Sequence, residues 1–289
     1  MIKSTGILVL LRLELSENMK NSLYLILALV FLSACGYENQ KVPAEKSIES
    51  MNNQDHLIMS ALFVQSAAEY KAQCYQAYNT ASYRLIEKLE KYSGSKPAVV
   101  LDLDETVLDN SLYAGFQINT GLPYTPESWK SWTEKALATV VPGTDDFLHL
   151  ADSLNVTLLY VSNRRVNELE DTKKNMEALG LPQLADSNFY LREEESEKET
   201  RRTQIADEGY DVLLYCGDQL GDFDRFWDDA ESEDRNARVH DQKHKFGTDY
   251  IIVPNPIYGI WERNLFKGRD LTKREKNQLR KEAVQGFTP

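Results

Sequence analysis

The sequence predicts an α/β fold, a Rossmann-like parallel sheet with helices on both faces. Two observations carry this prediction. Short, wholly apolar runs recur along the chain, as in strands that are buried on both faces of a parallel sheet. Segments with apolar residues at helical spacing stand between these runs, and such alternation is typical of βαβ units. With 289 residues, of which 42% are hydrophobic, the chain is long enough to bury a large core.

The elements follow one another in a regular order. We expect five strands, at residues 98–101, 156–161, 189–191, 212–215 and 250–253. We expect helices at residues 56–92, 145–153, 167–179 and 198–208, and a solvated amphipathic helix at 267–281. Ligand sites of such sheets lie at the carboxyl ends of the strands, so reactive residues are expected there.

Residues 1–34 are predicted to be a signal peptide of the lipoprotein type. Lys20 precedes an apolar stretch at 23–32, and two small residues then lead to Cys35, which is the order of an export signal. Leu-Ser-Ala-Cys at 32–35 resembles a lipobox, so we expect a lipid on Cys35; an ordinary signal peptide and a buried helix are the alternatives. We expect translation to start at Met19, a flexible tether at 35–54, and an exported protein anchored by lipid to the outer membrane.

Charge and cysteine content exclude two classes of protein. The formal net charge of −12 argues against a nucleic-acid partner, because phosphate backbones are held mainly by Lys and Arg. Three cysteines are too few for a disulfide scaffold. With Cys35 lipidated, Cys74 and Cys216 remain; we favour free, buried thiols, and leave open whether they pair.

Two carboxylates follow the first expected strand. Asp102 and Asp104 are two residues apart, so they share one side of the extended chain. Carboxylates this close together repel each other and lose solvation, and a divalent cation with a preference for hard oxygen ligands, such as Mg²⁺, relieves both costs. Asp102 is the expected nucleophile because it is ionised without a base, and Asp104 is placed to protonate a leaving group.

Further polar residues follow the other strands in order. Ser162 and Asn163 offer donors for anionic oxygens, Lys198 offers an ammonium, and Asp218 and Asp222 complete a cation site. Each residue also has a purely structural alternative. The two aspartates could cap a helix, and Lys198 could be a solvated charge among neighbouring glutamates.

This set resembles the haloacid dehalogenase superfamily and, within it, the bacterial class C acid phosphatases, a 5′-nucleotidase-like group of lipoproteins. The resemblance runs from about residue 69 to 261 and rests on Asp102-Leu103-Asp104-Glu105-Thr106, 113–115, 141–143, Gly217-Asp218 with Asp222, 245–247 and Pro254-Asn255. It implies the sheet of that superfamily over a phosphatase domain at 55–289, with a small helical cap formed around 55–94 and 110–140.

The resemblance also implies a mechanism and a substrate. We expect a Mg²⁺-dependent acid phosphatase that hydrolyses phosphomonoesters, nucleoside monophosphates above all, through an aspartyl-phosphate. Asp102, the Asp104 carbonyl and Asp218 would hold the metal with support from Asp222, while Ser162, Asn163 and Lys198 would bind the phosphoryl group. Trp129 and Tyr258 fall where relatives stack a nucleobase, with Tyr113 and Phe116 near the mouth; packing in the core is the alternative for these rings.

Two other functions stay open at this point: another phosphotransferase chemistry of the same superfamily, and a non-catalytic surface lipoprotein on the same scaffold. The presence of Asp102, Asp104, Lys198 and Asp218 together weighs against the second. The oligomeric state, a homodimer among the options, does not follow from the sequence.

Overall fold

The computed structural model describes residues 54–227 and 232–287, and a five-stranded sheet forms the centre of this part of the chain. All four strand pairings are parallel, in the order β5-β4-β1-β6-β7. The strands are β1 (Pro97–Leu101), β4 (Thr157–Arg165), β5 (Phe189–Arg192), β6 (Asp211–Gly217) and β7 (Tyr250–Ile252). The predicted fold class is therefore confirmed, and each of the five expected strands is present.

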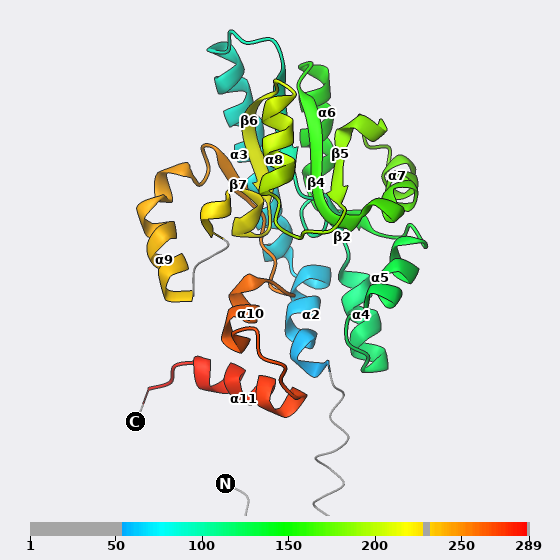
Figure 1. The fold of residues 1–289 in the computed structure, drawn as a ribbon, viewed down its shortest axis with the longest axis vertical. Coiled ribbons are helices and arrows are strands. Elements are labelled where there is room, and N and C mark those ends of the chain that lie inside the picture. The colour runs from blue at the N-terminus through cyan, green and yellow to red at the C-terminus, as the bar shows by residue number, and fades with distance from the viewer. Residues whose placement is uncertain (1–53, 228–231, 288–289) are drawn as a thin grey trace, which may run out of the picture. The chain divides into compact units, whose positions relative to one another are not determined.

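Side-chain alternation along the strands builds a core on each face of the sheet. Val99 and Leu101 of β1 pack into the larger core, together with side chains of α3 (Ala68–Glu90), α6 (Thr144–Ser153) and α7 (Leu169–Ala178). Ala98 and Val100 point the other way and pack with Ile205 of α8 (Glu199–Asp207). Helices thus cover both faces of the sheet, as predicted (Figure 1).

The strand order fixes where a ligand can bind. From β1 the chain builds β4 and β5 on one side of the sheet, and it then places β6 and β7 on the other side. The direction of winding therefore reverses between β1 and β6. In open α/β sheets the crevice outside the carboxyl ends of the strands at such a reversal is the usual ligand site.

A helical insert leaves the carboxyl end of β1. The antiparallel pair β2 (Leu108–Asp109) and β3 (Thr139–Val140) encloses α4 (Ser111–Thr120) and α5 (Pro126–Thr133). The α5 helix begins with a capping box of Thr125 and Ser128, with Pro126 in its first turn. This insert corresponds to the segment 110–140, and α2 (Ile58–Ser66) packs against its α4 helix.

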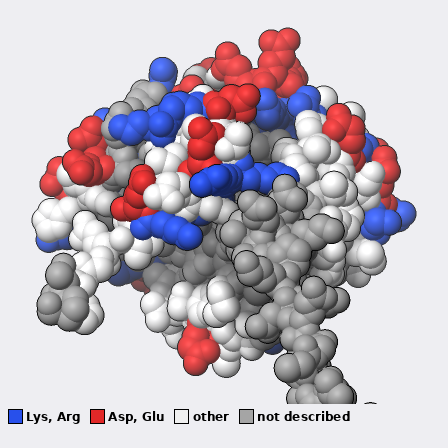
Figure 2. Space-filling model, turned by 90° about the horizontal axis from the view of Figure 1, so that it is seen from below, with Lys and Arg blue, Asp and Glu red and all other residues white. Residues whose placement is uncertain are grey.

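The α9 helix (Ser232–Asp241) lies between β6 and β7 in the chain, and α10 (Ile260–Phe266) and α11 (Lys273–Ala283) follow β7. The α10 and α11 helices lie with α2 and α4 at one end of the sheet (Figure 1), and Figure 2, which looks onto this end, shows Lys and Arg side chains interspersed with Asp and Glu. Short 3₁₀ turns connect the elements at Asp55–Leu57, Val166–Glu168, Asp186–Asn188, Leu220–Asp222, Arg225–Trp227 and Lys243–Lys245.

Two helix predictions were wrong in their extent. The expected helix at 56–92 is broken at Ala67, whose extended backbone (φ −80°, ψ 127°) separates α2 from α3. The break lets α2 pack on α4 while α3 packs on β6, β7 and α6. The expected helix at 267–281 begins later, because Thr272 and Glu275 form a capping box that starts α11 at Lys273.

The predicted signal peptide, the lipidation site Cys35 and all but the last residue of the predicted tether lie outside the described residues. Within residues 54–227 and 232–287, no helix is both long enough and apolar enough to cross a membrane. The assignment of 55–94 and 110–140 as parts of the cap stays a prediction.

Candidate active site

Three carboxylates meet at the reversal point of the sheet. Asp102 directly follows β1, and its amide continues the ladder by donating to the Cys216 carbonyl of β6 at 3.0 Å. Asp218 follows the last residue of β6, and the tight turn after it returns Asp222 to the same place. All three aspartates are buried, and one carboxylate oxygen from each lies within 4.8 Å of the others.

Gly217 makes this close approach feasible. A Cβ atom on Gly217 would lie 2.4 Å from the Cβ atom of Asp222 and 2.5 Å from its Oδ2. The Gln219 amide then fixes the Asp222 carboxylate by donating to Oδ2 at 2.9 Å. The glycine is therefore needed for the space that it leaves beside Asp222, since its backbone is not in the left-handed region.

The cluster has the electrostatics of a cation site. Burial raises the pKa of Asp218 to about 7, and the nearby Asp222 carboxylate adds to the effect, while hydrogen bonds from Gln219 and Asn255, each 2.7 Å long, oppose it. Burial also raises the pKa of Asp102, against the attraction of Lys198. Three buried carboxylates with no metal between them are costly, and their hard oxygens fit a divalent cation such as Mg²⁺.

The start of α8 supplies the positive charge. Lys198 is 6% exposed, and its Nζ pairs with Asp102 Oδ1 and, at 2.7 Å, with Asp222 Oδ1. Arg201 donates to Asn163 Oδ1 at 2.8 Å, and Arg202 donates to the Gly221 carbonyl at 2.8 Å. Lys198 is thus no solvated surface charge. The spacing of these three cations, i, i+3 and i+4, places them on one helix face that joins the ends of β4 and β6.

Asp104 lies outside the carboxylate cluster and is held by a different cation. Its Oδ1 accepts from Nε and Nη2 of Arg164, at 3.0 and 2.8 Å, and from Nδ2 of Asn110 at 2.9 Å. Arg164 is itself buried and donates from Nη1 to Thr172 Oγ1 at 3.0 Å. All three bonds end on Oδ1, so Oδ2 is the oxygen of Asp104 that can face a substrate.

The end of β4 places Ser162 and Asn163 beside β1. Ser162 is fully buried, and its Oγ accepts from the Arg164 amide at 3.1 Å. Asn163 is exposed, and its side-chain oxygen is directed to Arg201. The β4 strand continues to Arg165, so both residues lie within its last part rather than after its end, and α8 fixes the position of Asn163.

The predicted aromatic residues approach the site from separate elements. Tyr113 of α4 and Trp129 of α5 contact each other edge to face, with ring centroids 5.1 Å apart, and the Trp129 ring lies 5.8 Å from the guanidinium carbon of Arg164. Tyr258 lies in the loop after β7, is 42% exposed, and donates its hydroxyl to Glu105. Phe116 stacks on Tyr113 at 6.0 Å and is 40% exposed.

Sequence reasoning missed the side chains that hold these groups in place. Arg164 was not singled out, and Glu105 and Asn255 appeared only as parts of motifs with no role assigned to them. Glu105 is 2% exposed, and burial, with Asp104 beside it, raises its pKa to about 8, although hydrogen bonds from Tyr258 and the Asn110 amide oppose the rise. In the sequence, the signal for both Arg164 and Glu105 is a charged residue directly beside a predicted site residue near the end of a strand that is expected to be buried.

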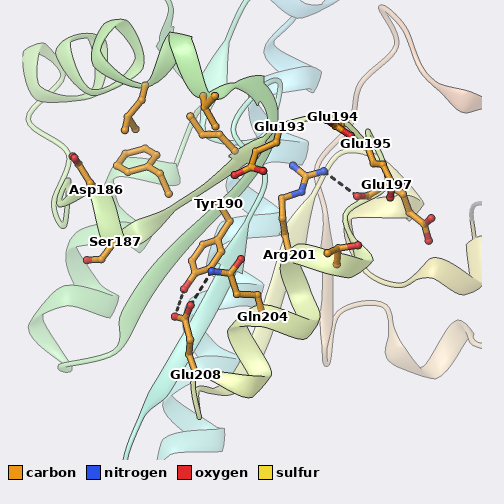
Figure 3. Close-up of a pocket in the computed structure, with 15 residues that line it drawn as sticks. Asp186, Ser187, Tyr190, Glu193, Glu194, Glu195, Glu197, Arg201, Gln204 and Glu208 are labelled. Atoms are coloured by element: carbon orange, nitrogen blue, oxygen red, sulfur yellow. Dashed lines mark hydrogen bonds between the residues drawn. The ribbon is translucent and has the colours of Figure 1, made fainter.

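A cavity of about 560 Å³ lies apart from the strand-tip aspartates, beside β5 and α8 (Figure 3). Its lining includes six acidic residues against a single arginine, and Tyr190 and Gln204 donate to Glu208 within it at 2.6 and 2.9 Å. This composition does not suit a phosphate ester.

Cys74 and Cys216 are both free and buried, so the two thiols do not pair.

The sheet, the paired strand-tip aspartates and the insert after β1 together define a phosphomonoesterase of the haloacid dehalogenase type. A sequence profile of the HAD superfamily, subfamily IIIB (acid phosphatase), matches residues 22–261, and the chain belongs to this family. It is similar to two structures of the class C acid phosphatase from Bacillus anthracis, one with tungstate bound, at 39% and 40% identity. Each comparison covers 82% of this chain and 100% of that chain, with a TM-score of 0.78.

Proposed function

We propose that this acid phosphatase uses Mg²⁺ and hydrolyses nucleoside monophosphates through an aspartyl-phosphate. The observation that carries the proposal is the position of Asp102, which stands at the tip of β1 in contact with the Lys198 ammonium and close to two further carboxylates. Asp104 stands two residues further on, with one of its oxygens fixed by Arg164.

In the first step, Asp102 attacks the phosphorus atom, and the bond between phosphorus and the ester oxygen breaks. The leaving alkoxide takes a proton from Asp104, whose Oδ2 is the oxygen left free of the Arg164 fork. The product alcohol leaves, and the phosphoryl group stays bonded to Asp102. Lys198 neutralises part of the charge on the phosphoryl oxygens.

In the second step, Asp104 takes a proton from a water molecule, which attacks the phosphorus atom of the aspartyl-phosphate. The bond between Asp102 and phosphorus breaks, and inorganic phosphate is released with the Asp102 carboxylate restored. Asp104 has then regained the proton that it gave up in the first step, so the cycle closes without another base.

The metal would be held by Asp102, Asp218 and the backbone carbonyl of Asp104, with Asp222 orienting bound water. When bound, Mg²⁺ supplies a positive charge that offsets both the carboxylate cluster and the phosphoryl oxygens. One structure of the B. anthracis relative has tungstate bound, a tetrahedral oxyanion like phosphate, which supports the proposal that this chain also binds an oxyanion.

Preference for a nucleoside rests on the aromatic residues. The Trp129 ring lies 5.8 Å from the guanidinium carbon of Arg164, which holds Asp104, and Tyr258 contacts Glu105, the residue after Asp104. Two rings from different elements therefore lie near Asp104. A flat, apolar leaving group stacks on such rings, whereas glycerol has no face to offer.

Release of phosphate from adenosine 5′-monophosphate, followed with and without EDTA, tests the proposal. We expect EDTA to abolish activity, added Mg²⁺ to restore it, and Asp102→Asn to be inactive. Asp270→Asn, on an exposed aspartate, is the matched control. An acid-quenched reaction with labelled substrate should leave label on the protein that hydroxylamine removes. Full activity in EDTA, or in Asp102→Asn, would refute the mechanism.

We also propose that Cys35 carries the lipid anchor and that the enzyme works outside the cytoplasm, at the outer membrane. This rests on the sequence of residues 19–35 alone. Incorporation of a labelled fatty acid should be lost in Cys35→Ser, and cell fractionation should then find the variant released from the membrane fraction.

A further inference from the structure

We propose that Glu105 is a positioning residue that fixes the ring of Tyr258 beside the active site and thereby sets the preference for aromatic leaving groups. The residues involved are Glu105, Tyr258, Asn255 and Gln219, which we call the tyrosine brace. This inference rests on the proposed function. It explains the proposed nucleotide preference by the way in which Glu105 orients the Tyr258 ring.

Hydrogen bonds fix both the backbone and the side chain of Glu105, which takes no part in the proposed proton transfers. Its backbone is left-handed, with φ 62°, which is unusual for a residue other than glycine, and its amide donates to the Leu108 carbonyl at 2.8 Å. The side chain is buried, and its Oε1 accepts from the Asn110 amide at 3.0 Å. The other oxygen, Oε2, is thereby directed to the Tyr258 hydroxyl.

The backbone that carries Tyr258 is fixed from the opposite side of the site. Asn255 Oδ1 accepts from the amide of Tyr258 at 3.4 Å and from that of Ile257 at 2.9 Å. Gln219 donates to the Tyr258 carbonyl at 3.3 Å. Asn255 and Gln219 each also donate to Asp218 Oδ2 at 2.7 Å, so the loop is tied to a carboxylate of the proposed metal site.

The loop also packs too closely to shift freely. Gly259 follows Tyr258, and a Cβ atom there would lie 2.6 Å from Gln219 Oε1 and 2.5 Å from the Trp261 ring. The Tyr258 side chain is nevertheless 42% exposed, so neighbouring residues enclose only part of the ring. Its hydroxyl bond to Glu105 is therefore what selects one orientation of an otherwise accessible ring.

A ring that is already oriented binds a leaving group without the entropy loss of ordering it. Removing the bond should weaken the use of aromatic substrates about two- to tenfold, which corresponds to the ordering of one side chain. The loss should appear in KM, because stacking on the leaving group is as strong before the reaction as in the transition state.

The test compares adenosine 5′-monophosphate with glycerol 3-phosphate in Tyr258→Phe, Glu105→Gln and the double variant. Phe keeps the ring and removes the hydroxyl donor. Gln keeps the oxygen that accepts from Asn110 but puts an NH₂ group, which cannot accept, in place of the charged oxygen that faces Tyr258. We expect each single variant to raise KM for the nucleotide two- to tenfold and to change KM for glycerol 3-phosphate less. The double variant should show the same rise in KM as the single variants. Tyr83→Phe on α3, where the side chain is 75% exposed, and Glu90→Gln are the matched controls.

Two results would overturn the inference: equal losses for both substrates, or effects that multiply in the double variant. If Glu105→Gln does not fold, as circular dichroism would show, Tyr258→Phe decides alone, since an unchanged substrate ratio refutes the brace. Tyr258→Ala separates this inference from the proposed function. If the wild type shows no preference for the nucleotide over glycerol 3-phosphate, and Tyr258→Ala does not change this, the proposed nucleotide preference is refuted. If the preference is lost in Tyr258→Ala but kept in Tyr258→Phe and Glu105→Gln, the tyrosine brace is refuted.

Discussion

Arg164→Lys should weaken the proposed acid role of Asp104 while leaving a positive charge beside it. Arg164 holds Asp104 Oδ1 with two N–H groups, at 3.0 and 2.8 Å, from a position where its side chain is 1% exposed. A lysine ammonium is a point charge that cannot reproduce this planar fork. Oδ2, the oxygen that must face the leaving group, would then be free to rotate away.

The magnitude follows from the loss of one charge-assisted hydrogen bond. Such a bond contributes about 1.5–3 kcal/mol, and a loss expressed fully in the transition state corresponds to roughly a 10- to 150-fold fall in kcat. The fall should be large for an alkyl phosphate, whose alkoxide needs a proton, and small for p-nitrophenyl phosphate, whose phenolate leaves without one.

Steady-state kinetics on these two substrates, with Arg274→Lys on an exposed site of α11 as the control, measures the effect. An equal fractional loss for both leaving groups would refute the reasoning, because it would show that Arg164 does not act through Asp104. Arg164→Ala should in addition lower the free energy of unfolding by about 3–5 kcal/mol, since it leaves Asp104 without its buried partner.

Three other predictions concern the metal site and the thiols. Gly217→Ala places a Cβ atom 2.4 Å from Asp222, so it should lower the free energy of unfolding by about 1–3 kcal/mol through overpacking. It should also raise the Mg²⁺ concentration needed for half-maximal activity, and an unchanged Mg²⁺ dependence would count against the proposed site. Mg²⁺ at 100 times its Kd should stabilise the fold by about 2.7 kcal/mol, seen as a rise in Tm that is absent in Asp218→Asn. Burial raises the pKa of Cys74 to about 11 and raises that of Cys216 as well, so neither thiol should react with iodoacetamide at pH 8 until the protein unfolds.

The sequence was sufficient for the sheet and for the residues at its strand ends. Runs such as 98–101 and 156–161 carry apolar side chains on both faces, as expected for a strand between two layers of helices. The same runs therefore predicted both the fold class and the positions at which the strands end. Once the strands are placed, Asp102, Ser162 and Asp218 must lie at the same edge. Prediction worked here because local pattern and tertiary position are linked by the period of the strand.

Prediction worked less well where tertiary packing decides. The helical spacing continues through Ala67 without a glycine or proline, yet the helix breaks there because α2 and α3 pack on different partners. The contacts of Arg164 with Asp104 and of Glu105 with Tyr258 span 60 and 153 residues, and no local pattern encodes such a pairing. A buried charge can be suspected from the sequence, whereas its partner is known only from the fold.

The acidic net charge raises the question of how an anionic substrate can bind at all. The answer lies in the local balance of charge around Asp102. Lys198 and Arg202 come from one face of α8, and each holds a segment that carries an aspartate: Lys198 pairs with Asp102 and Asp222, and Arg202 donates to the turn before Asp222. A net charge of −12 acts over the whole surface and is screened by salt within about 8 Å at physiological ionic strength. A buried ammonium beside Asp102 is screened far less. We infer that Lys198, together with the cation that the three carboxylates would hold, lets a phosphate ester approach Asp102 despite the overall charge.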